Sequence, residues 1–152
     1  GCSVSLISIY AVTSVSKLQY VFVSCLMAIA NNAKDNYFLD KIAVAMTARK
    51  GKIYFGCYKK GEDSLAEEVI KDCLIDTDSF HFSDGSFYGV GNGYSQEIMS
   101  KKNNAIKLIN NPETVLPDAK TMIKNAIKKY ELGIISNSFN IIPNYLMDEV
   151  AN

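Results

Sequence analysis

The stretch KIAVAMTARKGKIYFGCY, residues 41–58, indicates the fold class of this chain. Its first half alternates larger apolar residues with smaller ones, a period of two that predicts a β-strand. Lys50 and Gly51 interrupt that pattern, and a second run rich in β-branched and aromatic residues follows. We therefore expect two antiparallel strands, over 41–48 and 53–58, joined by a tight turn.

Amphipathic helices are predicted on both sides of this hairpin. Ser16 and Gln19 have the spacing of a capping box, and apolar residues recur after them at helical intervals. Ser64 and Glu67 repeat the capping-box spacing and predict a short helix over 65–74. The sequence thus indicates an α+β fold in which helices alternate with antiparallel strands.

Turn signals divide the second half of the chain. Asp84 and Gly85 separate two short apolar runs and predict a second hairpin. The glycine-rich run at 89–93 predicts a tight turn into a helix over 95–110. Asp118 is the expected N-cap of a last long helix, which Gly133 ends. Two further strands are expected over 4–12 and 134–142.

The composition predicts one soluble domain over 1–152. Hydrophobic residues make up 48% of the 152 residues and charged residues 21%, values typical of a single globular domain. The 16 basic and 16 acidic residues give a formal net charge of +0, so we expect no binding to nucleic acid or to anionic lipid. The longest apolar stretch, 20–30, is too short to span a bilayer.

The cysteines argue against a metal centre. The 4 cysteines are widely spaced and the chain has 1 histidine, so neither a zinc site nor another cofactor is expected. Unpaired cysteines on apolar faces are typical of a reduced, cytoplasmic protein. Residue 1 is glycine rather than methionine, which suggests a processed end or a piece of a longer chain.

Four local patterns allow a chemical as well as a structural interpretation. The glycine run at 89–93 would cradle a phosphate or simply make a turn. His81 would serve as a base for a cysteine or be a structural histidine, and the acidic residues at 76, 78 and 84 would bind magnesium or remain solvated. Cys2 would act as a nucleophile, with its own amino group as the base, if Gly1 were removed.

Three segments resemble a known family. The runs FYGVGNG at 87–93 and LPDAKTMIKNAIKKY at 116–130 resemble the glycine-turn strand and the penultimate long helix of proteasome-type N-terminal nucleophile hydrolases, especially the bacterial proteasome-like peptidase subunit. The run SLISIYAVTSVS at 5–16 is similar to the inner strand of that family where it enters the first helix. The resemblance covers most of the chain but lacks the N-terminal strands that carry the catalytic groups of the family.

The resemblance implies an αββα sandwich of antiparallel sheets between helix layers, with subunits that assemble into rings. It implies hydrolysis of amide bonds through a covalent intermediate. Asn92, Gly93, Glu131 and Ser136 would line the site, and Cys2 is the only candidate nucleophile. Homo- or hetero-oligomers are the expected assembly.

An alternative hypothesis comes from a different functional class. The lysine that activates the nucleophile in that family has no counterpart in a chain that begins at Cys2. This favours a non-catalytic interaction, scaffold or inhibitor protein. Such a protein would bind its partner through the basic hairpin, 49–60, and the acidic segment, 62–84.

Overall fold

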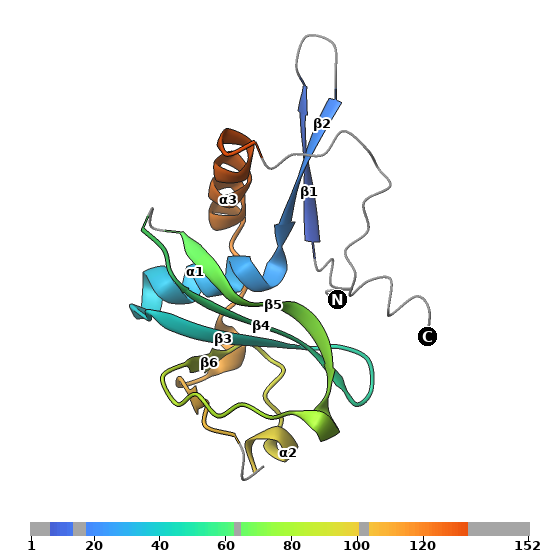
Figure 1. Ribbon diagram of the computed structural model, residues 1–152, viewed down its shortest axis with the longest axis vertical. Coiled ribbons are helices and arrows are strands. Elements are labelled where there is room, and N and C mark those ends of the chain that lie inside the picture. The colour runs from blue at the N-terminus through green and yellow to red at the C-terminus, as the bar shows by residue number, and fades with distance from the viewer. Residues whose placement is uncertain (1–6, 14–17, 63–64, 101–103, 134–152) are drawn as a thin grey trace.

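The structure is a computed structural model that describes residues 7–13, 18–62, 65–100 and 104–133. Its side chains are described from Ser24 onward. The elements, shown in Figure 1, are β1 (Ile7–Thr13), β2 (Leu18–Ser24), α1 (Cys25–Tyr37), β3 (Lys41–Thr47), β4 (Lys52–Lys60), β5 (Ala66–Asp76), the 3₁₀ turn η1 (Thr77–Ser79), β6 (Tyr88–Val90), α2 (Gln96–Met99), β7 (Lys107–Leu108), the 3₁₀ turn η2 (Pro112–Thr114) and α3 (Ala119–Glu131).

The main sheet has five strands in the order β5-β4-β3-β6-β7. The three strands β3, β4 and β5 pair antiparallel, whereas β3 with β6 and β6 with β7 pair parallel. Strands β1 and β2 form a separate antiparallel pair that extends away from this sheet (Figure 1). The α+β class is therefore confirmed. The expectation of purely antiparallel sheets was wrong. After β5 the chain crosses over, so that β6 lies beside β3 and runs in the same direction as β3.

The central strand β3 is buried on both faces. Ile42, Val44 and Met46 pack under α1 and α3 on one side. Ala43 and Ala45 face the opposite side, where three phenylalanines of the segment after β5 gather: Phe80, Phe82 and Phe87. The predicted alternation of large and small residues is confirmed, since the larger ones fill the space beneath the helices.

The helix predicted from Ser16 is instead a strand followed by a helix. Residues Leu18–Ser24 form β2, and α1 begins at Cys25. Ser24 is the observed N-cap, because its Oγ accepts a hydrogen bond from the backbone N of Met27 at 3.3 Å. The run YVFV at 20–23 consists of strong strand formers, and the ladder with β1 decides in favour of the strand.

The short helix predicted from Ser64 was also wrong. Residues Ala66–Asp76 form β5, an eleven-residue strand along β4. The pairing slips between Phe55 and Tyr58, where a Cβ added at Gly56 would lie 2.5 Å from the carboxylate of Asp72. Hydrogen bonds to β4 override the helical spacing, as tertiary context commonly does.

The second predicted hairpin does not form. Phe82 makes a single parallel bridge to Asn104, and β6 pairs with β3 instead of returning along 80–83. The helix expected over 95–110 ends at Met99. The side chain of Asn104 donates to the carbonyl of Ile98 and accepts from the backbone N of Ile106, so local polar contacts replace the helix.

The last helix agrees with its prediction. Asp118 caps α3, and Gly133 follows it with φ +76°. The strand predicted over 4–12 is confirmed over the described part of β1, and the one over 134–142 lies outside the described residues. None of the helices in the described ranges is long and apolar enough to cross a bilayer.

Candidate functional site

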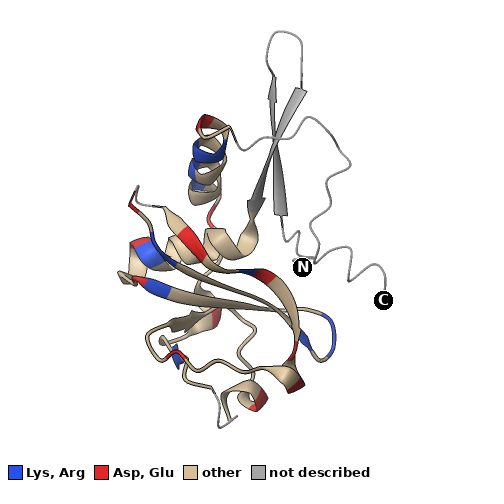
Figure 2. Cartoon of the chain, in the orientation of Figure 1, with Lys and Arg blue, Asp and Glu red and all other residues tan. Residues whose placement is uncertain are grey.

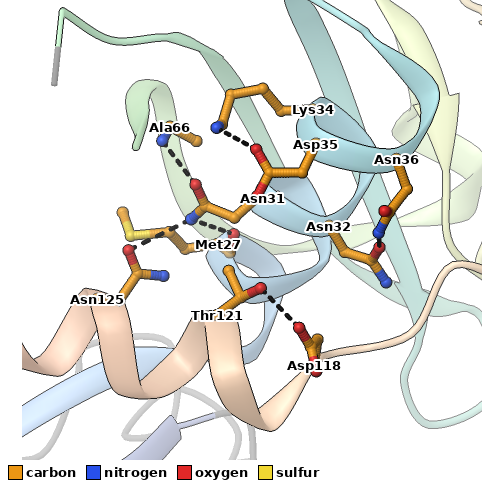
Figure 3. Close-up of polar contacts among 10 residues, drawn as sticks. All are labelled: Met27, Asn31, Asn32, Lys34, Asp35, Asn36, Ala66, Asp118, Thr121 and Asn125. Atoms are coloured by element: carbon orange, nitrogen blue, oxygen red, sulfur yellow. Dashed lines mark hydrogen bonds and ion pairs between the residues drawn. The ribbon is translucent and has the colours of Figure 1, made fainter. Parts of the chain in front are cut away.

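Buried amides hold α3 against α1 (Figure 3). Asn31 is 0% exposed, and its Nδ2 donates to the carbonyl of Met27 at 3.0 Å and to Oδ1 of Asn125 at 3.3 Å. Its Oδ1 accepts from the backbone N of Ala66 at 2.8 Å. One side chain of α1 therefore binds its own helix, α3 and the first residue of β5.

Asn125 leaves one polar group unpaired. The residue is 2% exposed, and its Nδ2 has no hydrogen-bond partner within the described part of the chain. A buried donor without an acceptor lowers the stability of the folded protein. The hydrogen bond that Asn125 accepts from Asn31 offsets part of this cost.

A carboxylate forms a second polar anchor near α3. Asp72 on β5 accepts hydrogen bonds from the hydroxyls of Tyr58 on β4 and of Ser24 at the start of α1. Burial raises the pKa of Asp72, and the two hydrogen bonds act in the opposite direction. The neighbouring Lys129 of α3 has its pKa lowered by burial, which the charges of Glu68 and Asp72 oppose.

The first turn of α3 is fixed by Asp118. Its Oδ2 accepts from the hydroxyl of Thr121 at 2.9 Å, and its Oδ1 accepts from the backbone N of Lys120 at 3.4 Å. These hydrogen bonds, led by that from Thr121, hold the pKa of Asp118 below its ordinary value. The helix is thus held at its N-terminus and along its inner side.

The apolar residues of α3 divide into two groups. Met122 and Ala126 are buried against α1, whereas Ile123, Ile127 and Tyr130 are 48%, 53% and 42% exposed. The exposed three recur at i, i+4 and i+7, so they form one line along the helix. We call Ile123, Ile127 and Tyr130 the α3 stripe.

Lysines run beside the α3 stripe. Lys120, Lys124 and Lys128 follow one another at intervals of four residues. Figure 2 shows the basic residues of α3 as blue bands along the helix. A cavity of about 300 Å³ lies between this helix, the end of α1 and Leu65. Lys124, Lys128, Ile127 and Glu131 contribute to its walls. Asp35 of α1 also lines the cavity, so the face combines apolar side chains, a line of lysines with two carboxylates near it, and a hollow.

The glycine-rich turn lies at the other end of the sheet. Asn92 accepts from the backbone N of Thr47 at 2.9 Å through its Oδ1, and from the Thr47 hydroxyl at 3.0 Å through its carbonyl. The backbone N of Gly93 donates to the carbonyl of Ala45 at 2.9 Å, and that of Gly91 to the carbonyl of Pro112 at 2.8 Å. Because these two amides are already satisfied within the chain, the turn is structural at both glycines.

The structure does not bring Asn92 and Glu131 together. Asn92 binds Thr47 at the end of β3, whereas Glu131 shares its cavity with Leu65. Leu65 precedes Ala66, which pairs with Lys60 at the end of β4. That end of β4 lies beside the start of β3, where Lys59 pairs with Lys41. The two predicted site residues are thus separated by the length of a seven-residue strand, about 20 Å.

The other predicted site residues have different outcomes. Cys2 and Ser136 lie outside the described residues, so their role stays a prediction. Asp84 accepts hydrogen bonds from the backbone N and hydroxyl of Ser86 in an exposed turn. Asp76 lies 3.6 Å from the ammonium of Lys52, and His81 is exposed.

The fold can now be compared with known proteins. No family model matches the sequence, and no curated protein matches it. YeaZ from Pseudomonas aeruginosa aligns with a TM-score of 0.65 and 18% identity, over 80% of this chain and 56% of that one. The chain is similar in fold to YeaZ. A second structure, an uncharacterized protein with similarity to peptidase YEAZ from Pseudomonas aeruginosa, aligns at a TM-score of 0.65 and 19% identity with the same coverage.

The similarity to YeaZ corrects the family expectation. The resemblance to proteasome-type N-terminal nucleophile hydrolases was wrong, and with it the expected proteasome-like peptidase activity. The resemblance depended on a glycine turn and an amphipathic helix, features that many α+β folds share. At this level of identity YeaZ shows the fold alone, and the chain spans 56% of the YeaZ length.

Proposed function

We propose that this chain is a protein-binding subunit that uses α3 to dock an acidic partner surface. The observation that carries the proposal is the α3 stripe, which leaves Ile123, Ile127 and Tyr130 between 42% and 53% exposed. Apolar anchors at i, i+4 and i+7 are the spacing with which helices bind protein grooves. Tyrosine is also enriched at protein interfaces.

The charge beside the stripe indicates the chemistry of the partner. Lys120, Lys124 and Lys128 form a line of positive charge on the neighbouring side of α3. A complementary surface presents an apolar centre flanked by aspartate or glutamate side chains. The cavity beside Ile127, about 300 Å³, has room for one large side chain of the partner.

The rigid placement of α3 favours binding. Asn31, Asn125 and Asp118 hold the helix at its inner side and at its start. Because the helix is already ordered before a partner arrives, little conformational entropy is lost on docking. A protein partner fits this face better than a lipid bilayer does, since the inner side of α3 is occupied by α1 and only a narrow apolar line is left.

The proposal revises the alternative hypothesis drawn from sequence. Most of the acidic segment, in which a helix was predicted over 65–74, is β5 and the loop after it, whereas the basic and apolar helix is α3. We place the subunit in the cytoplasm, because Cys57 and Cys73 are free thiols, a state that reducing compartments maintain.

Site-specific cross-linking in the native host would test the proposal. A photo-reactive amino acid would replace Ile127 or Tyr130 in the full-length natural protein, and exposed Glu113 would serve as the control position. A carbodiimide, which joins amines to carboxylates at zero length, would then be applied to the purified complex. We expect one protein to be captured from the stripe but not from 113, with carbodiimide links from Lys120 or Lys124 to its aspartates or glutamates.

Substitutions would measure the strength of the contact. Ile127→Glu should weaken binding to the captured protein about 10- to 100-fold, because it places a charge in the apolar centre. Lys124→Glu should weaken it less and make it less sensitive to salt, and Glu113→Gln should change nothing. Capture of lipid instead of protein, or unchanged affinity in Ile127→Glu, would overturn the proposal.

A further inference from the structure

We infer that this chain forms a two-fold symmetric dimer in which Phe38 of each copy enters a cavity of the other copy. Phe38 is the C-cap of α1 and is 88% exposed, more than any other large apolar residue in the described ranges. A protruding aromatic side chain of this kind is typical of an interface anchor that a partner buries. The inference does not depend on the α3 stripe.

The backbone conformation of Phe38 is unfavourable for a bulky residue. Its φ is 55° and its ψ is 42°, in the left-handed region where the backbone crowds a Cβ. Helices that end in this conformation usually carry glycine or asparagine there. Neither the backbone nor the buried part of the ring favours phenylalanine over glycine at position 38. This indicates that the ring has a role outside the folding of one copy.

A cavity of about 370 Å³ lies beside the ring. Its walls combine two apolar and four charged residues: Phe38, Leu39, Lys34, Asp35, Asp40 and Lys60. A benzene ring needs about 150 Å³, so the cavity has room for one phenyl group. With a two-fold axis beside Phe38, the ring of the second copy would pack there against Leu39 and the first ring.

The charges in the cavity walls favour a second copy of this chain as the occupant. The ammonium of Lys34 lies 2.6 Å from Oδ1 of Asp35, so these two charges balance within the chain. The carboxylate of Asp40 and the ammonium of Lys60 have no hydrogen bond or ion pair with any described residue. A two-fold axis sets Asp40 of each copy against Lys60 of the other, and makes the contact twice.

The other charged residues near the cavity do not compete for this contact. Nζ of Lys41 donates to the hydroxyl of Ser86 at 3.2 Å, and Nζ of Lys59 lies 3.9 Å from Oε2 of Glu67. Glu62 is exposed in the turn after β4 and does not line the cavity. The unpaired charges of the cavity are therefore one of each sign, which a uniformly acidic or basic partner would match only in part.

Charge reversal tests the pairing of Asp40 with Lys60. In Asp40→Lys two lysines face each other at both contacts, and in Lys60→Asp two aspartates do. Because the contact is small, we expect a weak dimer, whose dissociation constant each single change should raise about tenfold. An equimolar mixture of the two variants should form a heterodimer with nearly the original affinity, since each lysine then meets an aspartate. Sedimentation equilibrium of the full natural chain would measure these constants.

Phe38→Gly separates the dimer contact from folding. Glycine takes the left-handed conformation without strain, so the urea midpoint at about 1 μM, where the chain is monomeric, should stay the same or rise. The dimer dissociation constant should nevertheless rise about tenfold or more, because the anchor is gone. Ile127→Glu, which tests the α3 stripe, should leave the dimer unchanged.

Five results would overturn the inference. They are a wild-type chain that stays monomeric up to about 1 mM, a dimer indifferent to Phe38→Gly, a mixture that fails to recover, a lowered urea midpoint in Phe38→Gly, and a dimer lost in Ile127→Glu.

Discussion

Asn31 and Asn125 are 94 positions apart in the sequence, and Nδ2 of the first donates to Oδ1 of the second at 3.3 Å inside the protein. The contact joins α1, which covers the main sheet, to α3, which carries the proposed binding face (Figure 3). A buried amide pair specifies one arrangement of two helices, because only that arrangement satisfies its hydrogen bonds. The position of the α3 stripe therefore depends on this contact.

Removal of the Asn31 side chain should destabilise the fold. Asn31→Ala leaves the backbone N of Ala66 without its acceptor in a buried place, at a cost of about 1–3 kcal/mol in the free energy of unfolding. Asn125→Ala should cost less, because one of its two polar groups is already unpaired. Urea denaturation would measure both. Asn36→Ala, on the exposed side of α1, is the control and should stay within about 0.5 kcal/mol of the wild type.

Asp72 should make stability depend on pH in the acid range. The pKa of Asp72 in the folded protein is raised above the ordinary 3.8. The stability that the protonated carboxyl contributes to the fold is therefore complete below pH 3.8 and is lost as pH rises through the raised pKa. Asp72→Asn removes this dependence and keeps an acceptor for Tyr58, while its amide nitrogen would donate to the Ser24 hydroxyl in place of the hydrogen bond that Asp72 accepts from it. The variant should therefore gain stability relative to the wild type as pH rises above 3.8 and through the raised pKa of Asp72.

Asp72→Ala is the matched comparison for that experiment. It leaves the buried hydroxyl of Tyr58 without an acceptor and should cost about 1–3 kcal/mol. Urea midpoints followed by circular dichroism across the pH range would measure both variants. A difference between Asp72→Asn and the wild type that does not change with pH would contradict the role assigned to this carboxyl.

Cys57 should resist thiol reagents while the protein is folded. It is fully buried, and burial together with the charges of Cys73 and Asp84 raises its pKa to about 12. At pH 8 the reactive thiolate is then about one part in ten thousand. Cys73 is half-buried and should be modified before Cys57. Iodoacetamide labelling mapped by mass spectrometry, with and without urea, checks this order, and rapid native labelling of Cys57 would contradict it.

Gly91 and Gly51 should respond very differently to alanine. Both have positive φ, +102° and +77°. A Cβ at Gly91 would lie 2.1 Å from the carbonyl oxygen of Ala45, whereas none of the neighbours of Gly51 lies within 4 Å of such an atom. Gly51→Ala should cost about 1–2 kcal/mol from backbone conformation alone. Gly91→Ala should cost more than about 3 kcal/mol, because the overlap is added to it. Thermal denaturation would compare them, and equal losses would show that space at Gly91 does not matter.

Several local elements could be predicted because they depend on neighbouring residues. The strand pair around Gly51 follows from alternation and a turn, and α3 follows from its Asp118 cap and its apolar period. The exposure of the α3 stripe also had a signal. Apolar residues at adjacent positions, Met122 with Ile123, cover an arc wider than one packed face of a helix.

The α+β class, the β3–β4 hairpin and the last helix follow from the amino-acid sequence, because turn geometry, capping and periodicity are properties of short segments. Contacts in the folded protein were needed to show that 18–24 and 66–76 are strands, that β6 runs parallel to β3, and which residues of α3 remain exposed. Those outcomes depend on partners far away in the chain. A ladder with β1 or β4 supplies hydrogen bonds that outweigh helical spacing, and the buried pair of Asn31 and Asn125 sets which side of α3 faces inward.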